Sequence, residues 1–335
     1  MRKNITLILI VIILFAGCSR EPRYHKKRQL KGSISISGAF ALYPMAVLWA
    51  EEFMKIYPDV EIDISAGGAG KGMADVLNGM VDLGMVSREI NLAEYKKGAW
   101  NIAVVKDAVL PTISSKNPFI DSLKKKGVTR EQLKLIFIEG TINDWGIIAN
   151  NSKKHGAIHV FTRSDACGAG EMWGKYLGFN QEAIQGVGVY GDPGMAEAVR
   201  NEPSSIGYNN VIYAYDLVTR KFYDGIQVLP IDINNNGKID SYENFYDNLD
   251  SLNEAIRENK YPSPPGRELY FVSKGKPKKN VVKEFLKWIL TDGQKYVRKT
   301  GYVELAEKNR LDELAKIKFN LRRSFHLINT NNKEK

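Results

Sequence analysis

The sequence predicts an α/β protein built from two lobes, and two observations lead to this prediction. Strand-like stretches are followed repeatedly by a loop and then by a helical pattern, which is the chain order that produces parallel sheets. The chain has 335 residues, of which 44% are hydrophobic, so it can bury a large core and is long enough for two lobes rather than one.

The first three of these units lie in the N-terminal part of the chain. Residues 33–37 alternate between Ser and Ile and predict a strand, which a turn and a helical pattern follow. Residues 60–64 predict a second strand, which leads into the glycine loop Ser65-Ala-Gly-Gly-Ala-Gly-Lys-Gly-Met73 and a helix that opens at Met73. Residues 81–86 predict a third strand, which ends at Ser87. Because ligands bind at the carboxyl ends of parallel strands, we expect all three loops at a binding site.

The glycine loop at residues 65–73 is typical of backbone that approaches an anion, although a flexible turn is the alternative interpretation. Two familiar phosphate motifs do not fit it. The nucleotide P-loop would need Gly where Ser65 stands and Ser or Thr where Gly72 stands. The dinucleotide fingerprint would end on Met73 or Asp75 instead of Gly. The loop therefore indicates an anion other than a nucleotide.

A similar arrangement recurs further along the chain. Apolar runs at residues 102–105 and 109–113 predict a crossing between lobes, and Thr129 followed by Gln132 predicts a capping box that opens a helix. Residues 157–162 predict a strand that leads into the glycine-bearing loop 163–170. Two lobes with such loops could hold one ligand from both sides.

The net charge of +10 favours anionic ligands or surfaces. Basic residues are spread along the chain without an aromatic-interleaved basic motif, so we do not expect nucleic acid as a partner.

The N-terminus predicts export and a lipid anchor. Arg2 and Lys3 precede an apolar run from Leu7 to Ala16, which is typical of a signal peptide over residues 1–17. The run ends in a segment that resembles a bacterial lipobox, with Cys18 as the lipidated residue. We expect residues 18–31 to form a lipid-anchored tether at the cell envelope; an uncleaved anchor is the alternative.

The other cysteine, Cys167, then has no disulfide partner within the chain. An enzyme could use Cys167 as a nucleophile with His155 or His159 as base. No sequence pattern places a base near the thiol, and the four histidines lack ligand or triad spacing. We therefore expect a protein that is not an enzyme.

A second motif predicts a calcium site. Residues 232–243 satisfy the twelve-residue calcium-loop pattern, with Gly237 at the sharp turn. The predicted Ca²⁺ ligands are side-chain oxygens and one backbone carbonyl: Asp232, Asn234, Asn236, the Lys238 carbonyl, Asp240 and Glu243. A loop of this kind between a strand and a helix would serve as a structural clip; an Asn-rich turn is the alternative.

Several motifs together carry a resemblance to a known family over about residues 32–305. They are Ser37-Gly-Ala-Phe-Ala-Leu-Tyr-Pro44, the glycine loop, Val81-Asp-Leu-Gly84, Arg163-Ser-Asp165, Gly191-Asp-Pro-Gly-Met-Ala-Glu-Ala-Val199, Ser205-Ile-Gly-Tyr208, Trp288-Ile-Leu-Thr-Asp-Gly-Gln-Lys-Tyr296 and Gly301-Tyr-Val303. In this order they resemble the phosphate-binding proteins of ABC phosphate importers. The resemblance implies a two-lobed type II periplasmic-binding-protein fold that closes on an oxyanion in an interlobe cleft and delivers it to a membrane permease.

The resemblance also implies a set of ligand-binding residues: Ala41, Leu42, Tyr43, Ala69, Ser87, Arg88, Arg163, Asp165, Cys167, Gly168 and Ala169. Hydroxyl-bearing residues of the family fall on Leu42, Ala69, Cys167 and Ala169 here, and the family's proton-accepting Asp falls near Ser87. Asp165 is then the obvious carboxylate to separate phosphate from sulfate.

We therefore expect lobe 1 at residues 32–108 and 266–316, lobe 2 at residues 109–265, and a C-terminal tail at residues 317–335. The expected function is a monomeric solute-binding lipoprotein that captures inorganic phosphate or a related oxyanion for an ABC importer. The alternative is a calcium-stabilised surface binding or signalling module that has lost phosphate transport.

Overall fold

A computed structural model describes residues 30–151 and 155–318 of the chain. Residues 31–335 form one compact unit separate from residues 1–30. The predicted signal peptide, Cys18 and nearly all of the predicted tether and C-terminal tail lie outside the described residues.

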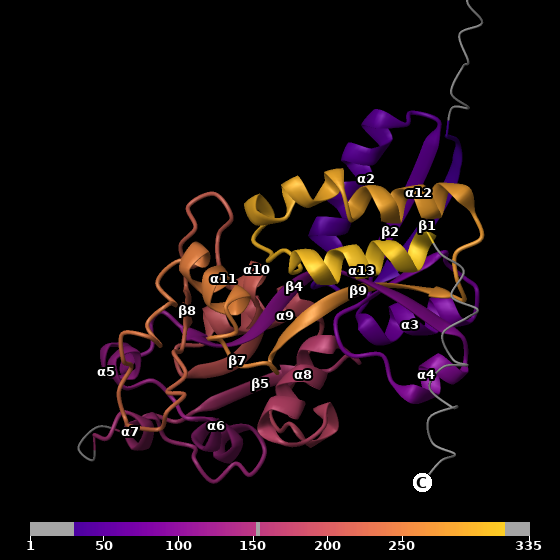
Figure 1. The fold of residues 1–335 in the computed structure, drawn as a ribbon. Helices are drawn as coiled ribbons and strands as arrows, with labels where there is room; N and C mark the ends of the chain where they lie inside the picture. Colours follow the sequence, from indigo (N-terminus) through magenta and orange to yellow (C-terminus); the bar gives the residue numbers. More distant parts are fainter. Residues whose placement is uncertain (1–29, 152–154, 319–335) are drawn as a thin grey trace, which may run out of the picture. The chain divides into compact units, whose positions relative to one another are not determined.

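The described residues form a nine-stranded sheet with the strand order β2-β1-β3-β9-β4-β7-β5-β6, and β8 pairs with β4 (Figure 1). The strands are β1 (Gly32–Gly38), β2 (Val60–Ala66), β3 (Leu83–Val86), β4 (Ala99–Ser114), β5 (His159–Arg163), β6 (Val187–Val189), β7 (Ser205–Asn210), β8 (Ile226–Val228) and β9 (Gly266–Lys274). Strand β1 is parallel to β2 and β3, and β5 is parallel to β6 and β7. Each lobe thus has the parallel core that the repeated strand, loop and helix pattern predicts.

Two long strands, β4 and β9, join the lobes and run antiparallel to their neighbours. The sequence pattern predicted a parallel sheet, so these antiparallel strands differ from that prediction. Residues Ala99–Ala108 of β4 pair with β9, and Val109–Ile113 pair with β7. Strand β9 is also antiparallel to β3. Strand β4 continues directly from one lobe into the other without a turn. Its apolar residues are buried on both sides of this crossing.

Helices cover the sheet of each lobe (Figure 1). Those of lobe 1 are α2 (Tyr43–Ile56), α3 (Ala69–Leu77), α4 (Leu92–Lys96), α12 (Asn280–Ile289) and α13 (Glu307–Lys318). Those of lobe 2 are α5 (Ile120–Lys126), α6 (Arg130–Phe137), α7 (Trp145–Ile148), α8 (Gly168–Leu177), α9 (Gly191–Asn201), α10 (Val211–Ala214) and α11 (Leu249–Arg257). Short 3-10 helices are η1 (Gln181–Ala183), η2 (Asp292–Tyr296) and η3 (Arg298–Thr300).

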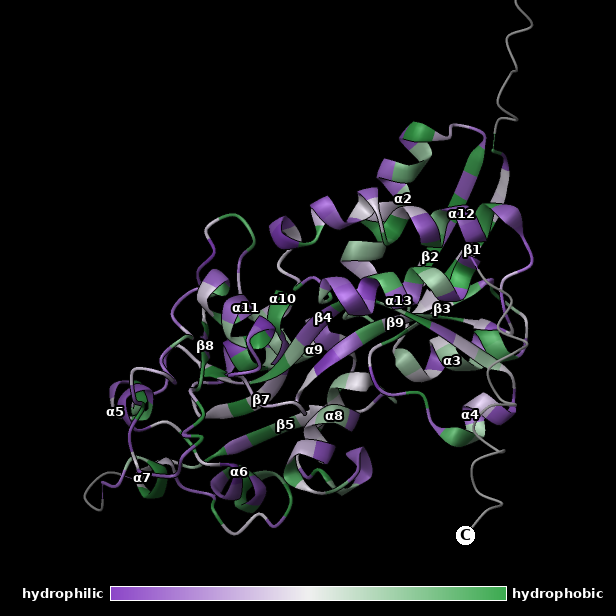
Figure 2. Cartoon of the chain, in the orientation of Figure 1, coloured by the Kyte–Doolittle hydropathy of each residue, from purple (hydrophilic) through white to green (hydrophobic). Residues whose placement is uncertain are grey.

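Local sequence signals explain how these helices begin and pack. Helix α6 begins with the predicted capping box: the Thr129 side chain accepts a hydrogen bond from the Gln132 N–H, and the Gln132 side chain accepts one from the Thr129 N–H. Helix α2 buries Trp49 and Phe53 completely. Figure 2 shows hydrophobic and hydrophilic residues on different sides of single helices, as in α11, because each helix packs one face on the sheet.

The main difference from the predicted elements is the glycine loop. Helix α3 begins at Ala69 rather than at Met73, so Gly70 and Gly72 belong to its first turns. Their missing side chains have a packing reason: a Cβ at Gly72 would lie 2.7 Å from the Gly38 Cα atom of β1. The glycines at these positions thus let α3 pack closely on the sheet as well as open the loop.

Candidate functional site

Four helices begin at the boundary between the lobes, at the carboxyl ends of parallel strands. Helices α2 and α3 follow β1 and β2 in lobe 1, and helices α8 and α9 follow β5 and β6 in lobe 2. The lobes touch there, because the Gly70 N–H donates a hydrogen bond of 3.1 Å to the Ala166 carbonyl. The first residues of a helix carry N–H groups without intrahelical acceptors, so this boundary has the character of an anion site.

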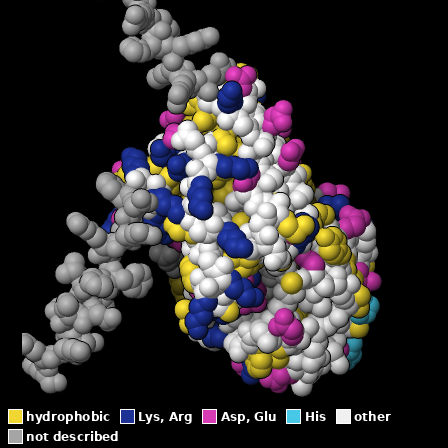
Figure 3. Space-filling view, turned by 90° about the vertical axis from the view of Figure 1, so that its right-hand side faces the viewer, with side chains coloured by type: hydrophobic (Ala, Val, Ile, Leu, Met, Phe, Trp, Pro, Cys, Tyr) yellow, Lys and Arg dark blue, Asp and Glu magenta, His cyan; other side chains and the backbone are white. Residues whose placement is uncertain are grey.

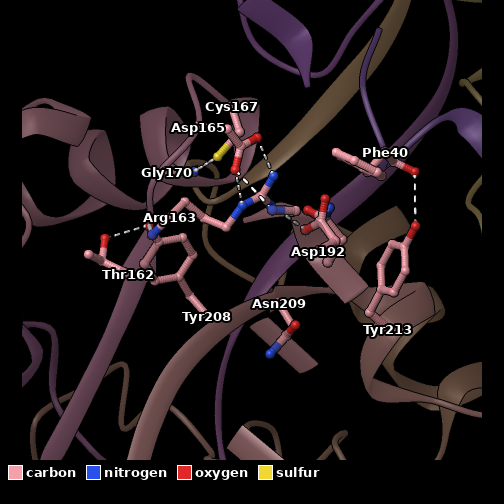
Figure 4. Close-up of polar contacts among 12 residues, drawn as sticks. Phe40, Thr162, Arg163, Asp165, Cys167, Gly170, Asp192, Tyr208, Asn209 and Tyr213 are labelled. Atoms are coloured by element: carbon pink, nitrogen blue, oxygen red, sulfur yellow. Dashed lines mark hydrogen bonds and ion pairs between the residues drawn. The ribbon is translucent and has the colours of Figure 1, made fainter. Parts of the chain in front are cut away.

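Arg163 is the buried cation of this boundary, with a side chain that is 0% exposed. It ends β5, and its backbone N–H donates to the Tyr208 hydroxyl at 3.0 Å, which fixes the start of the loop. Its Nε and NH2 groups donate to Asp165 Oδ1 and Oδ2 at 2.8 and 2.6 Å (Figure 4). The ring of Phe40 from lobe 1 lies 5.8 Å from the guanidinium carbon and covers it.

A second carboxylate, which we did not predict, flanks the same guanidinium. Asp192, at the start of α9, places Oδ1 2.9 Å from Arg163 NH1 and is only 3% exposed. This contact is an ion pair between two buried side chains. Burial raises the pKa of Asp192, and the charges of Arg163 and Arg267 partly oppose the increase.

The polar cluster continues from Asp192 to the strands that join the lobes. The Asn210 side-chain amide donates to Asp192 Oδ1 at 2.7 Å, and Arg267 NH2 donates to Asn210 Oδ1. Arg267 NH2 also lies 3.3 Å from Asp107 Oδ2. Burial raises the pKa of Asp107 to about 6 despite the nearby Arg267. Arg163 is thus linked through buried side chains to β9 and β4.

Ser87 and Gly168 face each other directly across the lobe boundary. A Cβ at Gly168 would lie 2.2 Å from Ser87 Oγ and 2.3 Å from the Ser87 carbonyl oxygen. The backbone of α8 therefore approaches β3 so closely that only glycine fits. Asp165 Oδ2 and the Ala166 carbonyl would likewise both lie 3.0 Å from a Cβ at Gly68.

Cys167 caps helix α8. Its Sγ accepts a hydrogen bond of 3.2 Å from the Gly170 N–H, and burial raises the pKa of the thiol to about 12. His155 contacts Asp144 and His159 contacts Glu202, so both imidazoles have carboxylate partners of their own. This geometry gives no support to a cysteine nucleophile.

The other predicted ligand residues occupy more varied positions. The N–H groups of Leu42 and Tyr43 donate to Ala39 and Phe40 carbonyls within their own turn. The Ala41 carbonyl accepts a hydrogen bond of 2.8 Å from the Tyr302 hydroxyl. Ala69 and Ala169 are buried at the starts of α3 and α8.

Arg88 is paired with a carboxylate of its own lobe. Its NH1 and NH2 groups donate to the two carboxylate oxygens of Glu94 at 2.9 and 2.6 Å. Glu94 also closes the capping box of α4 with Asn91. The guanidinium of Arg88 is therefore engaged within lobe 1.

The residues that sequence reasoning missed are Asp107, Asp192, Asn210 and Arg267. Asp107 had a usable signal, because it is a charged residue between two apolar runs. Asp192 lies in a motif that contributed to the family resemblance, but no role was assigned to it. Asn210 and Arg267 had no local signal, because they reach the cluster only through the pairing of β7 and β9 with β4.

A family model described as a PBP superfamily domain matches residues 25–293, well over half of the chain. The chain belongs to the PBP superfamily. Among its relatives, the phosphate-binding protein PstS of Bacillus subtilis (strain 168) is 28% identical over 242 residues, covering 68% of this chain and 77% of its own length. The PstS of Pseudomonas aeruginosa (strain PAO1) is 28% identical over 320 residues, covering 86% and 87%.

Solved structures show the same fold. One is an inferred phosphate ABC transporter substrate-binding protein from Clostridium perfringens with bound phosphate, with a TM-score of 0.67, 22% identity, and coverage of 82% of this chain and 100% of its own. Another is an ABC-type phosphate transport receptor from Vibrio cholerae, with a TM-score of 0.59, 16% identity, and coverage of 81% and 100%. The expected two-lobed fold of the PBP superfamily is therefore confirmed.

The predicted calcium loop of this PBP superfamily member lies in lobe 2 between β8 and α11. Asp232 and Glu243, at its two ends, are 1% and 0% exposed. The Asp232 carboxylate accepts hydrogen bonds from the N–H groups of Asn236 and Gly237 at 3.2 and 2.8 Å. Gly237 has φ of +81°, which suits a sharp turn.

Within residues 30–151 and 155–318, no helix has the length and apolar character needed to cross a membrane. In the same residues no group of three or more His, Cys, Asp or Glu side chains is placed to hold a metal ion. The calcium pattern draws only three of its six ligands from such residues, namely Asp232, Asp240 and Glu243.

Proposed function

We propose that this protein is a solute-binding protein that captures inorganic phosphate or a related tetrahedral oxyanion and delivers it to an ABC importer, without chemistry on the ligand. The relatives named phosphate-binding protein PstS support this function. The observation that supports this function most directly is the position of Arg163. Its fully buried guanidinium lies at the lobe boundary, where helices begin on both sides. A guanidinium and helix N-termini together suit an oxyanion.

The geometry supports the class of ligand better than it supports phosphate in particular. Asp165 uses both carboxylate oxygens on Arg163, and its Oδ1 also accepts the Gly191 N–H at 3.1 Å. Both carboxylate oxygens of Asp165 therefore already accept hydrogen bonds from the protein. Asp165 is not a simple acceptor for the proton that distinguishes phosphate from sulfate. Selectivity for phosphate would need another carboxylate, and Asp192 is the other one that contacts Arg163.

Isothermal titration calorimetry tests the function. The protein for this test is residues 31–335, which contain every described strand and helix. We expect one site per chain for phosphate or arsenate, with weaker binding of sulfate or molybdate. Folded protein that binds none of the four ions would overturn the proposal and favour a surface binding module that has lost transport.

Export and lipid anchoring complete the proposal. The signal peptide at residues 1–17 and Cys18 would place the protein at the cell envelope, next to its permease, as a monomer. Mass spectrometry of the N-terminal peptide from the native host tests this. A diacylglyceryl group on Cys18 is the expected result, and a chain that retains residues 1–17 would contradict it.

We also propose that residues 232–243 bind Ca²⁺ as a structural clip. Asp232 and Glu243 are buried carboxylates, and the ion pair of Lys238 with Asp240 at 3.0 Å within this loop involves neither of them. The side-chain amides of Asn234 and Asn236 converge on Asp240 Oδ2 at 3.0 and 2.7 Å. Buried carboxylates at both ends of the twelve-residue ligand pattern suit an oxygen-coordinated cation.

A further inference from the structure

A basic groove lies in lobe 1, away from the proposed oxyanion site. It has a volume of 260 Å³ and is formed by the segment between β9 and α12 together with the end of α3 and the following turn. Its lining residues are Val76, Gly79, Val81, Asp82, Ser273, Lys274, Lys276, Pro277, Lys278, Lys279 and Val282. We call this surface the lysine groove.

The charge of the lysine groove is strongly unbalanced. Four of its lining residues are lysines, and the single acidic one, Asp82, lies 2.8 Å from Lys279 Nζ. Lys274 and Lys278 have exposed side chains. The right-hand side of Figure 1, where β9 leads into α12, faces the viewer in Figure 3, and that face carries a band of Lys and Arg side chains.

The groove is a defined structure rather than a loose run of lysines. The Gly275 N–H donates to the Gly98 carbonyl at 2.7 Å, and Ser273 Oγ donates to the Gly275 carbonyl at 2.7 Å. Lys279 immediately precedes the ten-residue helix α12, so the positive end of that helix dipole adds to the lysine charges. The lysine groove is therefore a positively charged depression whose backbone is held in place by hydrogen bonds.

An exposed apolar side chain stands beside this charge. Met80 lies between the lining residues Gly79 and Val81 and is 72% exposed. A cationic surface with one projecting apolar side chain matches the interfacial region of an anionic bilayer, where phosphodiester groups lie above the acyl chains. No aromatic residue lines the groove, so the bases of a nucleic acid have no aromatic side chain there on which to stack.

The groove also lies where the N-terminal segment joins the fold. A Cβ at Gly32, the first residue of β1, would lie 3.5 Å from Val281, two residues after Lys279. Any anchor upstream of Lys31 must therefore connect to the fold beside the lysine groove.

We propose that the lysine groove docks lobe 1 on anionic phospholipid headgroups. This contact is independent of the oxyanion site and adds to any N-terminal anchor. It orients lobe 1 toward the bilayer. Because the attraction is electrostatic, it weakens as ionic strength rises.

Vesicle co-sedimentation of residues 31–335 tests the proposal without the contribution of a lipid anchor. The probe is vesicles of phosphatidylcholine with and without phosphatidylglycerol. We expect binding to the anionic vesicles at low salt, little binding to neutral vesicles, and release at high salt. Absence of binding to anionic vesicles, or equal binding to neutral ones, would overturn the proposal.

Two variants that lose the same number of lysines distinguish vesicle binding by the groove from vesicle binding by the net charge of the protein. The triple variant Lys274→Gln, Lys276→Gln and Lys278→Gln should lower the vesicle partition coefficient at least about tenfold. The control Lys124→Gln, Lys125→Gln and Lys126→Gln removes the same charge from α5 in lobe 2 and should change it less than about twofold. Equal losses in both variants would contradict a specific surface. Binding to heparin without binding to vesicles would assign the groove to a soluble polyanion and would also contradict it.

Discussion

Arg163 NH1 lies 2.9 Å from Asp192 Oδ1, although the opposite edge of the same guanidinium already carries a bidentate pair with Asp165. The Arg163 side chain is 0% exposed, and those of Asp192 and Asp165 are 4% and 8% exposed. One buried cation thus balances two buried carboxylates, and Arg267 supplies further positive charge to Asp192. An oxyanion that binds Arg163 must therefore compete with carboxylates that are already in place.

Replacement of Arg163 by Gln should affect both stability and binding. Two buried carboxylates lose their cation, so we expect a loss of about 3–5 kcal/mol in the free energy of unfolding. Phosphate binding should weaken by at least about 1.5–3 kcal/mol, the usual range for a charged hydrogen bond. Urea unfolding and calorimetry measure the two effects.

The double variant Arg163→Gln with Asp192→Asn distinguishes these effects. Removing one of the uncompensated carboxylates should restore part of the stability, whereas binding should stay weak. Full recovery of phosphate affinity in the double variant would show that Arg163 acts only by balancing Asp192.

Asp107 should make stability depend on pH. Burial raises the pKa of Asp107 in the folded protein from 3.8 to about 6, so the folded state holds this proton more tightly than the unfolded state does. The contribution of this proton to the free energy of unfolding is fully present below pH 3.8 and is lost as pH rises to about 6. The shift corresponds to roughly 3 kcal/mol.

The measurement is urea unfolding of the parent and of Asp107→Asn across this pH range. The difference in unfolding free energy between parent and variant should fall as pH rises from about 4 to 6. A constant difference would show that the Asp107 carboxyl does not change its pKa on folding.

The sequence was most informative where the determining interactions are local. The alternation of Ser and Ile in β1 and the Thr129 and Gln132 capping box depend on neighbouring residues, and the structure confirms both. The predicted start of α3 was wrong because Gly70 and Gly72 have a low helix propensity. Tertiary packing of α3 on β1 overrides this low propensity.

The candidate site follows the same rule. Arg163 and Asp165 are two residues apart, so their pairing could be anticipated from one loop. Asp192, Asn210, Arg267 and Asp107 come from four separate elements, and only strand pairing brings them together. No spacing along the chain encodes that cluster.

Gly168 should be intolerant of even one methyl group. In Gly168→Ala the added Cβ would lie 2.2 Å from Ser87 Oγ and 2.3 Å from the Ser87 carbonyl oxygen, so the lobes must separate at this point. We expect phosphate affinity to fall by at least about tenfold, because a displaced α8 no longer presents its N-terminus correctly.

Gly194 provides the matched control for Gly168. It is also helical, and a Cβ there meets no atom within 4 Å. Calorimetry of Gly194→Ala should give the parent affinity. Equal affinities for Gly168→Ala and Gly194→Ala would show that close approach of the lobes at Ser87 is not needed for binding.

Calcium should stabilise the protein through Glu243. Its carboxylate is 0% exposed and accepts hydrogen bonds from the N–H groups of Ile233, Asn234 and Asp240, so it already ties the two ends of the loop together. A cation at hundredfold excess over its dissociation constant adds about 2.7 kcal/mol to the free energy of unfolding. We therefore expect Ca²⁺ to raise the Tm of residues 31–335 by several degrees and a chelator to reverse the increase. Glu243→Gln should abolish that response, whereas the exposed Glu258→Gln should retain it, and the same calcium response in Glu243→Gln as in the parent would exclude the loop as the site.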